Sequence, residues 1–249
     1  MMDISTGLLA AAAVTFFAAG IVKGVTGMGL PTVAMGVLGA LISPLAAASL
    51  LIVPSFVTNV WQLFAGPSVF RLVRRLWLMM LAIVVGTVVG ASLLTSGNTQ
   101  LTTIALGGAL IVYAAYTLVA RQLYVPAPWE TWLSPLIGGI TGLVTGGTGV
   151  FVIPAVPYLQ SLGLEKEDLI QALGLSFTVS TIALAFGLAG RGAFQMDNLI
   201  LSTLAIAPAL AGMWVGQIAR RRISPQTFRR WFLICLLLLG AEMVVRPLL

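Results

Sequence analysis

The chain has 249 residues, of which 59% are hydrophobic and only 8% are charged. Soluble domains carry roughly a quarter charged residues, and the mean hydropathy here is +1.06, so the composition excludes a soluble globular protein and predicts a polytopic protein with the lipid bilayer as partner. The formal net charge of +6 does not indicate nucleic-acid binding, because the arginines cluster at the ends of apolar segments, as in the cytoplasmic loops of membrane proteins.

The first half begins with two short apolar segments, 7–22 and 30–42, separated by the Gly-rich stretch Val25-Thr26-Gly27-Met28-Gly29. A membrane-spanning helix needs about 20 apolar residues. The two short segments are therefore predicted to be half-helices of a broken or re-entrant hairpin. Three longer segments follow and are predicted to cross the membrane: 45–65, 77–94 and 101–120.

The second half repeats this order. Segments 132–144 and 150–162 flank a second Gly-rich stretch, Val144-Thr145-Gly146-Gly147-Thr148-Gly149, and three long segments follow at 169–189, 199–219 and 228–245. We predict two transmembrane repeats, residues 1–122 and 131–249. A linker at 123–130 joins them, because its prolines lack the N–H group that a continuing helix needs.

The loop charges predict that the two repeats are inverted. One hairpin and three crossings make an odd number, so the second repeat starts on the opposite side from the first. With Arg71, Arg74 and Arg75 placed inside, the five-arginine loop 220–230 also lies inside, and only Arg191 is misplaced. Four crossings per half would place that loop outside, against the positive-inside rule. The charges do not distinguish a re-entrant hairpin from two short complete crossings.

Two glycine pairs with the spacing GxxxG occur at matching places in the two halves. Gly86 and Gly90 are followed by Gly212 and Gly216, at an offset of 212 − 86 = 126. Such pairs allow helices to approach closely. We predict close packing at both pairs, within a protomer or between protomers, and a homodimer is expected from these faces.

The two Gly-rich breaks are the candidate substrate site. Unwound backbone survives at membrane depth only when it is buried in protein or lines a wet cavity, and its free N–H groups favour an anion. Paired interruptions in two halves are typical of transporter binding sites, although both breaks are also compatible with simple packing kinks. The candidate residues are Thr26, Gly27 and Gly29 in the first break and Thr145, Gly146, Gly147, Thr148 and Gly149 in the second.

Lys23 directly precedes the first break and is surrounded by apolar sequence. An ionisable residue at membrane depth is costly and is a functional hypothesis by default. If it faces a cavity, its ammonium group supplies a full positive charge for an anionic substrate. The alternative is that its long side chain reaches the membrane interface.

Polar residues also gather on the long segment that follows each hairpin. Asn59 and Ser176 are the candidates for hydrogen bonds to oxyanion oxygens, and bonding to a neighbouring helix is the alternative. The other members of the two groups are Ser49, Ser55, Thr58 and Gln62 in the first half, and Thr178, Ser180 and Thr181 in the second.

The sequence contains no histidine and one cysteine, so a histidine-based metal site is excluded. It shows no Walker A lysine motif and no GxSxG elbow. We expect neither enzymatic activity nor a cofactor nor a metal.

The whole pattern resembles the TauE/SafE family of sulfite and sulfonate exporters. The resemblance rests on the duplicated Gly-rich hairpins, on Ala172-Leu173-Gly174-Leu175-Ser176 with Ala46-Ala47-Ala48-Ser49, and on Gly-Arg-Gly-Ala-Phe at 190–194. It implies a multi-pass protein of the bacterial inner membrane that moves sulfite, sulfoacetate or a related organosulfur anion.

We expect a secondary transporter that works by alternating access between its two repeats. No acidic residue falls well inside a predicted crossing, which favours export driven by the membrane potential over a proton relay. The alternatives are an anion channel and a membrane assembly subunit without transport activity.

Overall fold

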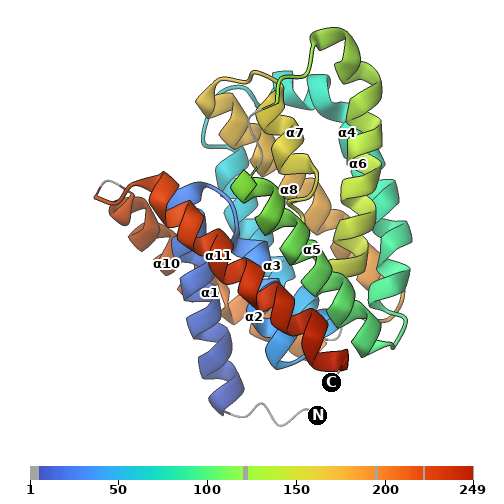
Figure 1. Ribbon diagram of the computed structural model, residues 1–249, viewed down its shortest axis with the longest axis vertical. Coiled ribbons are helices and arrows are strands. Elements are labelled where there is room, and N and C mark those ends of the chain that lie inside the picture. The colour runs from blue at the N-terminus through green and yellow to red at the C-terminus, as the bar shows by residue number, and fades with distance from the viewer. Residues whose placement is uncertain (1–5, 120–122, 194–195, 221, 249) are drawn as a thin grey trace.

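The structure is a computed structural model that describes residues 6–119, 123–193, 196–220 and 222–248 (Figure 1). Every regular element within these residues is a helix. Residues 1–5 and 120–122 of the predicted first repeat, Phe194 of the Gly-Arg-Gly-Ala-Phe motif and Arg221 of the arginine loop lie outside the described residues.

The predicted order of elements is found in both halves. The helices of the first half are α1 (Thr6–Thr26), α2 (Leu30–Leu41), α3 (Pro44–Leu63), α4 (Val69–Leu94) and α5 (Thr99–Val119). Those of the second half are α6 (Ala127–Thr148), α7 (Ala155–Ser161), α8 (Lys166–Ala189), α9 (Met196–Leu204), α10 (Ile206–Ala219), α11 (Pro225–Val245) and a terminal 3₁₀ turn, η1 (Arg246–Leu248). The predicted crossing at 199–219 is thus divided at Ala205, and α6 already begins inside the predicted linker.

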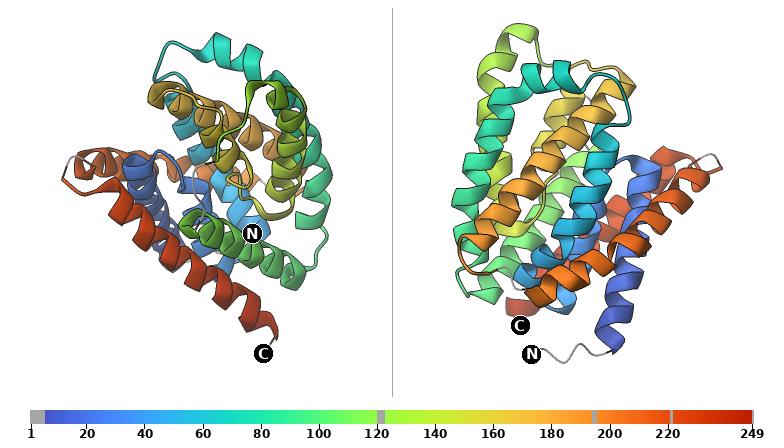
Figure 2. Two further views of the ribbon diagram at one scale, coloured as in Figure 1. Left: turned by 45° about the horizontal axis from the view of Figure 1, so that its top comes forward. Right: turned by 180° about the vertical axis from the view of Figure 1, so that it is seen from behind.

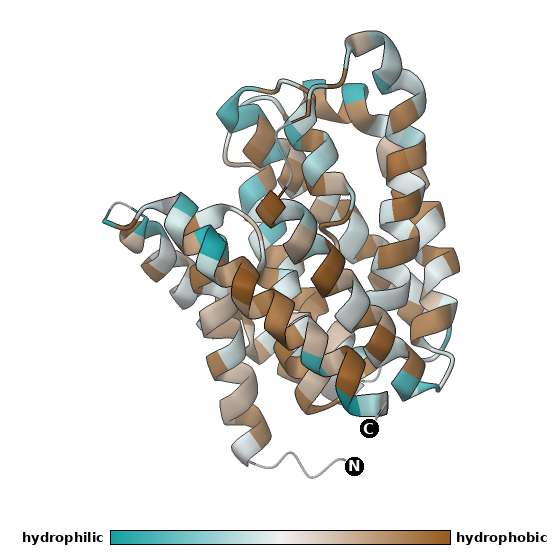
Figure 3. Cartoon of the chain, viewed as in Figure 1, coloured by the Kyte–Doolittle hydropathy of each residue, from teal (hydrophilic) through white to brown (hydrophobic). Residues whose placement is uncertain are grey.

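Six helical segments among the described residues are long and apolar enough to cross a membrane, and they confirm the class that composition predicts. They are 7–26, 44–63, 69–94, 99–119, 166–189 and 199–219. Large apolar side chains such as Phe70, Phe186 and Trp231 are exposed on the outer faces, which suits contact with lipid. Figure 3 shows hydrophilic residues concentrated toward helix ends and loops.

The hairpins are broken, but the prediction that their first arms are half-helices is wrong. Helix α1 has 21 residues and α6 has 22, whereas the second arms α2 and α7 have 12 and 7. The sequence suggested early ends because glycine disfavours helix interiors. In the structure, Gly24 and Gly146 lie inside α1 and α6, where the missing side chain lets another helix come close.

Each first arm packs against a helix of the opposite half, α1 against α10 and α6 against α4 (Figures 1 and 2). A Cβ atom on Gly20 would overlap the carbonyl oxygen of Ala209, and one on Gly142 would overlap that of Ile83. The two contacts correspond at constant offsets, since 142 − 20 = 122 and 209 − 83 = 126. The internal duplication therefore extends to individual packing contacts. The inverted orientation of the two copies remains a prediction.

The GxxxG pairs are used inside the chain. Gly86 and Gly90 contact the backbone of α6, and Gly212 and Gly216 contact the backbone of α1. Because both pairs are used within the chain, they no longer support the expected homodimer. The homodimer stays a prediction.

Two further pairs join counterpart helices of the two halves, α3 with α8 and α5 with α11. Helices α3 and α8 are the most buried of the candidate spans: 61% of the apolar stretch of α3 and 72% of that of α8 is buried. Their polar residues are therefore placed in the interior of the protein.

Candidate functional site

The two breaks have the same local structure. Thr26 Oγ1 donates a hydrogen bond to Val22 O (2.8 Å) and accepts one from Met28 N (3.3 Å). Thr148 Oγ1 donates to Val144 O (2.6 Å) and accepts from Val150 N (3.2 Å). Each threonine precedes a glycine of positive φ, Gly27 (78°) or Gly149 (71°), a conformation that glycine adopts without steric cost.

Thr26 is therefore the counterpart of Thr148, at the offset 148 − 26 = 122 found in the helix packing. It is not the counterpart of Thr145, which the similar order Val-Thr-Gly in the two stretches suggests. Helix α6 continues to Thr148, so Thr145, Gly146 and Gly147 are helical. The expectation that these three residues form an unwound loop with free N–H groups is wrong, because Gly146 contacts the backbone of α4 and Gly147 contacts a leucine of α4.

The first break is short. Gly27 and Gly29 have φ values of 78° and 100°, and Pro31 lies in the first turn of α2. The second break runs from Gly149 to Pro154, directly before α7. Only its first residue, Gly149, is among the candidate residues, and the rest of the break lies further along the chain.

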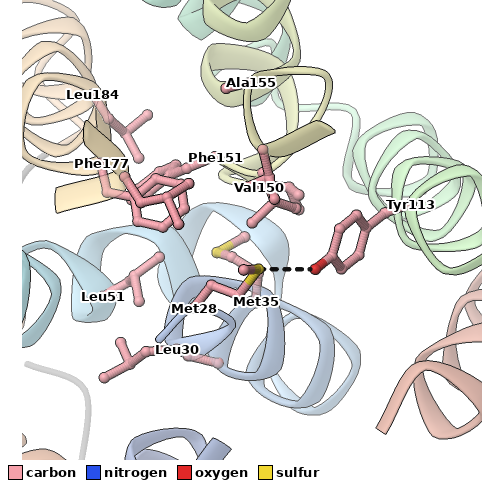
Figure 4. Close-up of a cluster of buried hydrophobic side chains, with 14 of the residues drawn as sticks. Met28, Leu30, Met35, Leu51, Tyr113, Val150, Phe151, Ala155, Phe177 and Leu184 are labelled. Atoms are coloured by element: carbon pink, nitrogen blue, oxygen red, sulfur yellow. Dashed lines mark hydrogen bonds between the residues drawn. The ribbon is translucent and has the colours of Figure 1, made fainter. Parts of the chain in front are cut away.

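The breaks meet in a shared apolar cluster (Figure 4). Met28 of the first break and Val150 and Phe151 of the second are buried there. The Tyr113 hydroxyl of α5 donates a hydrogen bond to Met28 Sδ (3.7 Å). The side chains of the two breaks therefore pack together in the apolar core between the hairpins.

Lys23 lies in the last turn of α1, where the partial negative charge of the helix C-terminus favours a cation. Its side chain is buried, with 3% of the residue exposed. Lys23 Nζ donates hydrogen bonds to Thr58 Oγ1 (3.1 Å) and to Asn59 Oδ1, both on α3. The alternative in which this lysine reaches the membrane interface is therefore wrong.

Asn59 extends the network to the second half. Its Nδ2 donates to Thr181 Oγ1 of α8 (3.3 Å), and the Thr181 hydroxyl donates to Phe177 O (2.7 Å). One buried polar network thus joins α1, α3 and α8. The sequence marked Thr58 and Thr181 only as members of polar groups, because spacing along one helix does not show which side chain faces a lysine on another.

The Lys23 ammonium has no acidic partner in the described part of the chain. The ion pairs found there join Arg71 to Asp168, Arg75 to Glu130 and Arg246 to Glu242. Among the residues whose burial the structure describes, the buried polar side chains include lysine but neither aspartate nor glutamate. The centre of the protein therefore holds an amino group whose positive charge, when protonated, is not neutralised by a carboxylate.

Several buried hydroxyl groups lack a hydrogen-bond partner. Ser55 precedes Asn59 by about one turn of α3, and Ser176 and Ser180 lie one turn apart on α8. Buried polar groups are normally paired. The candidate Ser176 is thus buried and free to bond, whereas the hydroxyls of Thr26, Thr145 and Thr148 donate to backbone carbonyls.

The described residues contain no group of three or more His, Cys, Asp or Glu side chains that could hold a metal ion. The polar groups of the network are one amine, one amide and several hydroxyls. This set can bind an anion by charge and hydrogen bonds.

The profile of the sulfite exporter TauE/SafE family matches residues 12–243, nearly the whole chain. The chain belongs to the TauE/SafE family. No curated protein and no solved structure shows a significant match to it. The family is one of membrane transporters, so this TauE/SafE protein is a multi-pass membrane transporter of the sulfite exporter class.

Proposed function

We propose that this protein exports small organosulfur oxyanions, such as sulfite or sulfoacetate, across a bacterial inner membrane by alternating access. The substrate binds in the network of Lys23, Thr58, Asn59 and Thr181. Ser55, Ser176 and Ser180 supply further hydrogen bonds, and the backbone of the two breaks lies nearby.

The observation that carries this proposal is the burial of Lys23 without a carboxylate. An ionisable residue inside a membrane protein is costly, and removing an ammonium group from water is unfavourable unless the charge is paired. A bound oxyanion would offset this cost. An ordinary structural lysine would have an acidic partner or would reach the surface, and among the described residues Lys23 does neither.

The closed site supports alternating access over a continuous pore. Lys23 is 3% exposed, and the apolar cluster lies between the breaks. A channel needs a continuous open path, whereas a carrier passes through a closed state. We propose that the α1–α10 and α4–α6 pairs move as units, because their backbones are in close contact.

The membrane potential is the proposed driving force. A potential that is negative inside drives an anion outward by about 2.3 kcal/mol per charge per 100 mV. The lack of a buried acidic residue in the described part of the chain favours this mechanism over a relay of protons through carboxylates.

The test is flux in proteoliposomes under an imposed potential, with sulfite, sulfoacetate and sulfate as substrates. Lys23→Met should abolish saturable flux. The matched control is Lys166→Met, because Lys166 is exposed and is the only other lysine in the chain; this variant should transport normally. Both variants must be monodisperse and equally thermostable in detergent.

Three outcomes would overturn parts of the proposal. Normal flux in Lys23→Met would remove the lysine from the site. Flux that does not saturate and shows no counter-transport would indicate a channel. A well-folded wild-type protein that moves none of these anions would favour an assembly subunit or a different substrate.

A further inference from the structure

A polar pocket lies apart from the Lys23 network, where α5 ends and α11 begins. It has a volume of about 320 Å³ and is bounded by residues of α5, α7, α8 and α11. Its polar side chains are Tyr116 and Thr117 of α5, Gln160 of α7 and Arg229 of α11. These groups offer one permanent positive charge together with hydroxyl and amide donors.

Arg229 in this pocket has an unsatisfied buried nitrogen. Its Nε atom is buried without a hydrogen-bond partner, and the ion pairs of the described residues do not include it. An unpaired buried donor costs about 1–3 kcal/mol, and more when the group is charged. Such a nitrogen indicates an acceptor that arrives from outside the protein.

Two other arginines lie near this pocket, but each already has a carboxylate partner. Arg71 and Arg75 line an adjacent pocket, which shares Gly163 and Leu164 with the Arg229 pocket. Arg71 is paired with Asp168 at 2.5 Å and Arg75 with Glu130 at 2.7 Å. The guanidinium of Arg229 is therefore the one available to an anion in this pair of pockets, within the part of the chain that the structure describes.

The pocket is connected to the first break. Tyr116 of its lining lies on α5 about one turn after Tyr113, and the Tyr113 hydroxyl donates a hydrogen bond to Met28 Sδ of the first break. Arg229 is also specific to one half. It is the fifth residue of α11, and the fifth residue of α5 is the uncharged Thr103. A symmetric duplication would not produce this pocket, so it marks one end of the transporter.

We infer that the Arg229 pocket is a staging site that binds the transported oxyanion before it reaches Lys23. The flat guanidinium group donates in pairs to the oxygens of sulfite or a sulfonate. The loop 220–224 precedes α11, and its arginines place this end in the cytoplasm by the positive-inside rule. The inference rests on the proposed function, because it assumes that the pocket serves substrate on its way out.

The test measures sulfite binding by isothermal titration calorimetry on full-length protein in lipid nanodiscs. Lys23→Met serves as the background in which the central site is disabled. This protein should keep a weaker binding event, and adding Arg229→Gln should lower the affinity of that event at least about tenfold, which is 1.4 kcal/mol. Arg230→Gln is the matched control, because Arg230 is the next residue and is exposed.

Arg229→Lys tests folding and geometry together, since it keeps the charge and loses the paired donors. It should give an affinity between those of the wild-type and glutamine side chains. In proteoliposomes, Arg229→Gln should raise the half-saturating sulfite concentration on the side of loop 220–224 and leave that of the opposite side unchanged.

Three results would overturn the inference. The first is that the Lys23→Met protein binds no sulfite. The second is that, in the Lys23→Met background, adding Arg229→Gln or Arg230→Gln gives the same sulfite affinity. The third is that Arg229→Gln leaves the sulfite isotherm unchanged but loses bound anionic lipid in native mass spectra, which would assign the guanidinium to a lipid phosphate. If wild-type protein shows no flux but the Arg229-dependent isotherm persists, the proposed function fails and the anion site stands.

Discussion

Asn59 accepts a hydrogen bond from the Lys23 ammonium and differs from aspartate only in its amide nitrogen. Asn59→Asp therefore places a carboxylate against the lysine without changing the volume of the side chain. We expect the new ion pair to neutralise the site, so that sulfite flux falls at least about tenfold, while the protein stays folded. The measurement is saturable flux in proteoliposomes together with a melting curve in detergent.

The control for this prediction is Asn98→Asp, the same substitution at an exposed residue. Asn98 Oδ1 accepts from Leu101 N (2.9 Å), and a carboxylate can accept the same bond. This variant should transport normally. Unchanged flux in a folded Asn59→Asp protein would show that the charge of Lys23 is not what the substrate uses.

Gly146 allows α6 to contact α4. A Cβ atom there would overlap the carbonyl oxygen of Thr87, and backbone atoms cannot rotate away, so Gly146→Ala should destabilise the protein by about 1–3 kcal/mol. Gly139→Ala in the same helix meets nothing within 4 Å and should be neutral or slightly stabilising. Melting temperatures of the two variants in the same detergent test this prediction; equal values would contradict the close contact.

Ser202 of α9 completes the hydrogen bonds of α3 at its internal proline, Pro54. Pro54 lacks an N–H group, so the Leu50 carbonyl loses its helical partner, and Ser202 Oγ donates to Leu50 O (2.8 Å) and accepts from Val53 N (3.1 Å). Ser202→Ala leaves the Leu50 carbonyl without a partner and removes the bond from Val53 N. We expect a loss of about 1–3 kcal/mol, measured as a lower melting temperature, with the exposed Thr203→Ala as control.

Pro54→Ala tests the same relationship from the other side. It restores an N–H group that can bond Leu50 O, so Ser202→Ala should cost less in the Pro54→Ala background than in wild type. Strictly additive effects would show that Ser202 does not compensate for the proline.

The inverted orientation of the two halves can be tested by labelling. Ser96 and Ile223 are exposed in the turns before α5 and α11, which occupy matching places. Single cysteines at these two positions, in a Cys235→Ala background, should react with an impermeant maleimide from opposite sides of the membrane. Labelling of both from the same side would contradict inverted repeats and the assignment of loop 220–224 to the cytoplasm.

The sequence anticipated the repeated element order because apolar segments of membrane length are set by composition, and composition does not depend on tertiary contacts. It placed Gly27 and Gly149 within the two breaks, because the conformational freedom of glycine is a local backbone property. It misplaced the second break, since Gly146 and Gly147 look like helix breakers when their packing partners are unknown.

The amino-acid sequence by itself determined that this chain is a helical membrane protein built from two similar halves, with one lysine in apolar surroundings. Only the tertiary structure decided what the glycines and that lysine do. Gly146 lies inside a helix because α4 is at contact distance, and Lys23 is buried because Thr58 and Asn59 of α3 accept its hydrogen bonds. Both depend on partners distant in sequence, 59 and 36 residues away for Thr87 and Asn59, which spacing along one helix does not reveal.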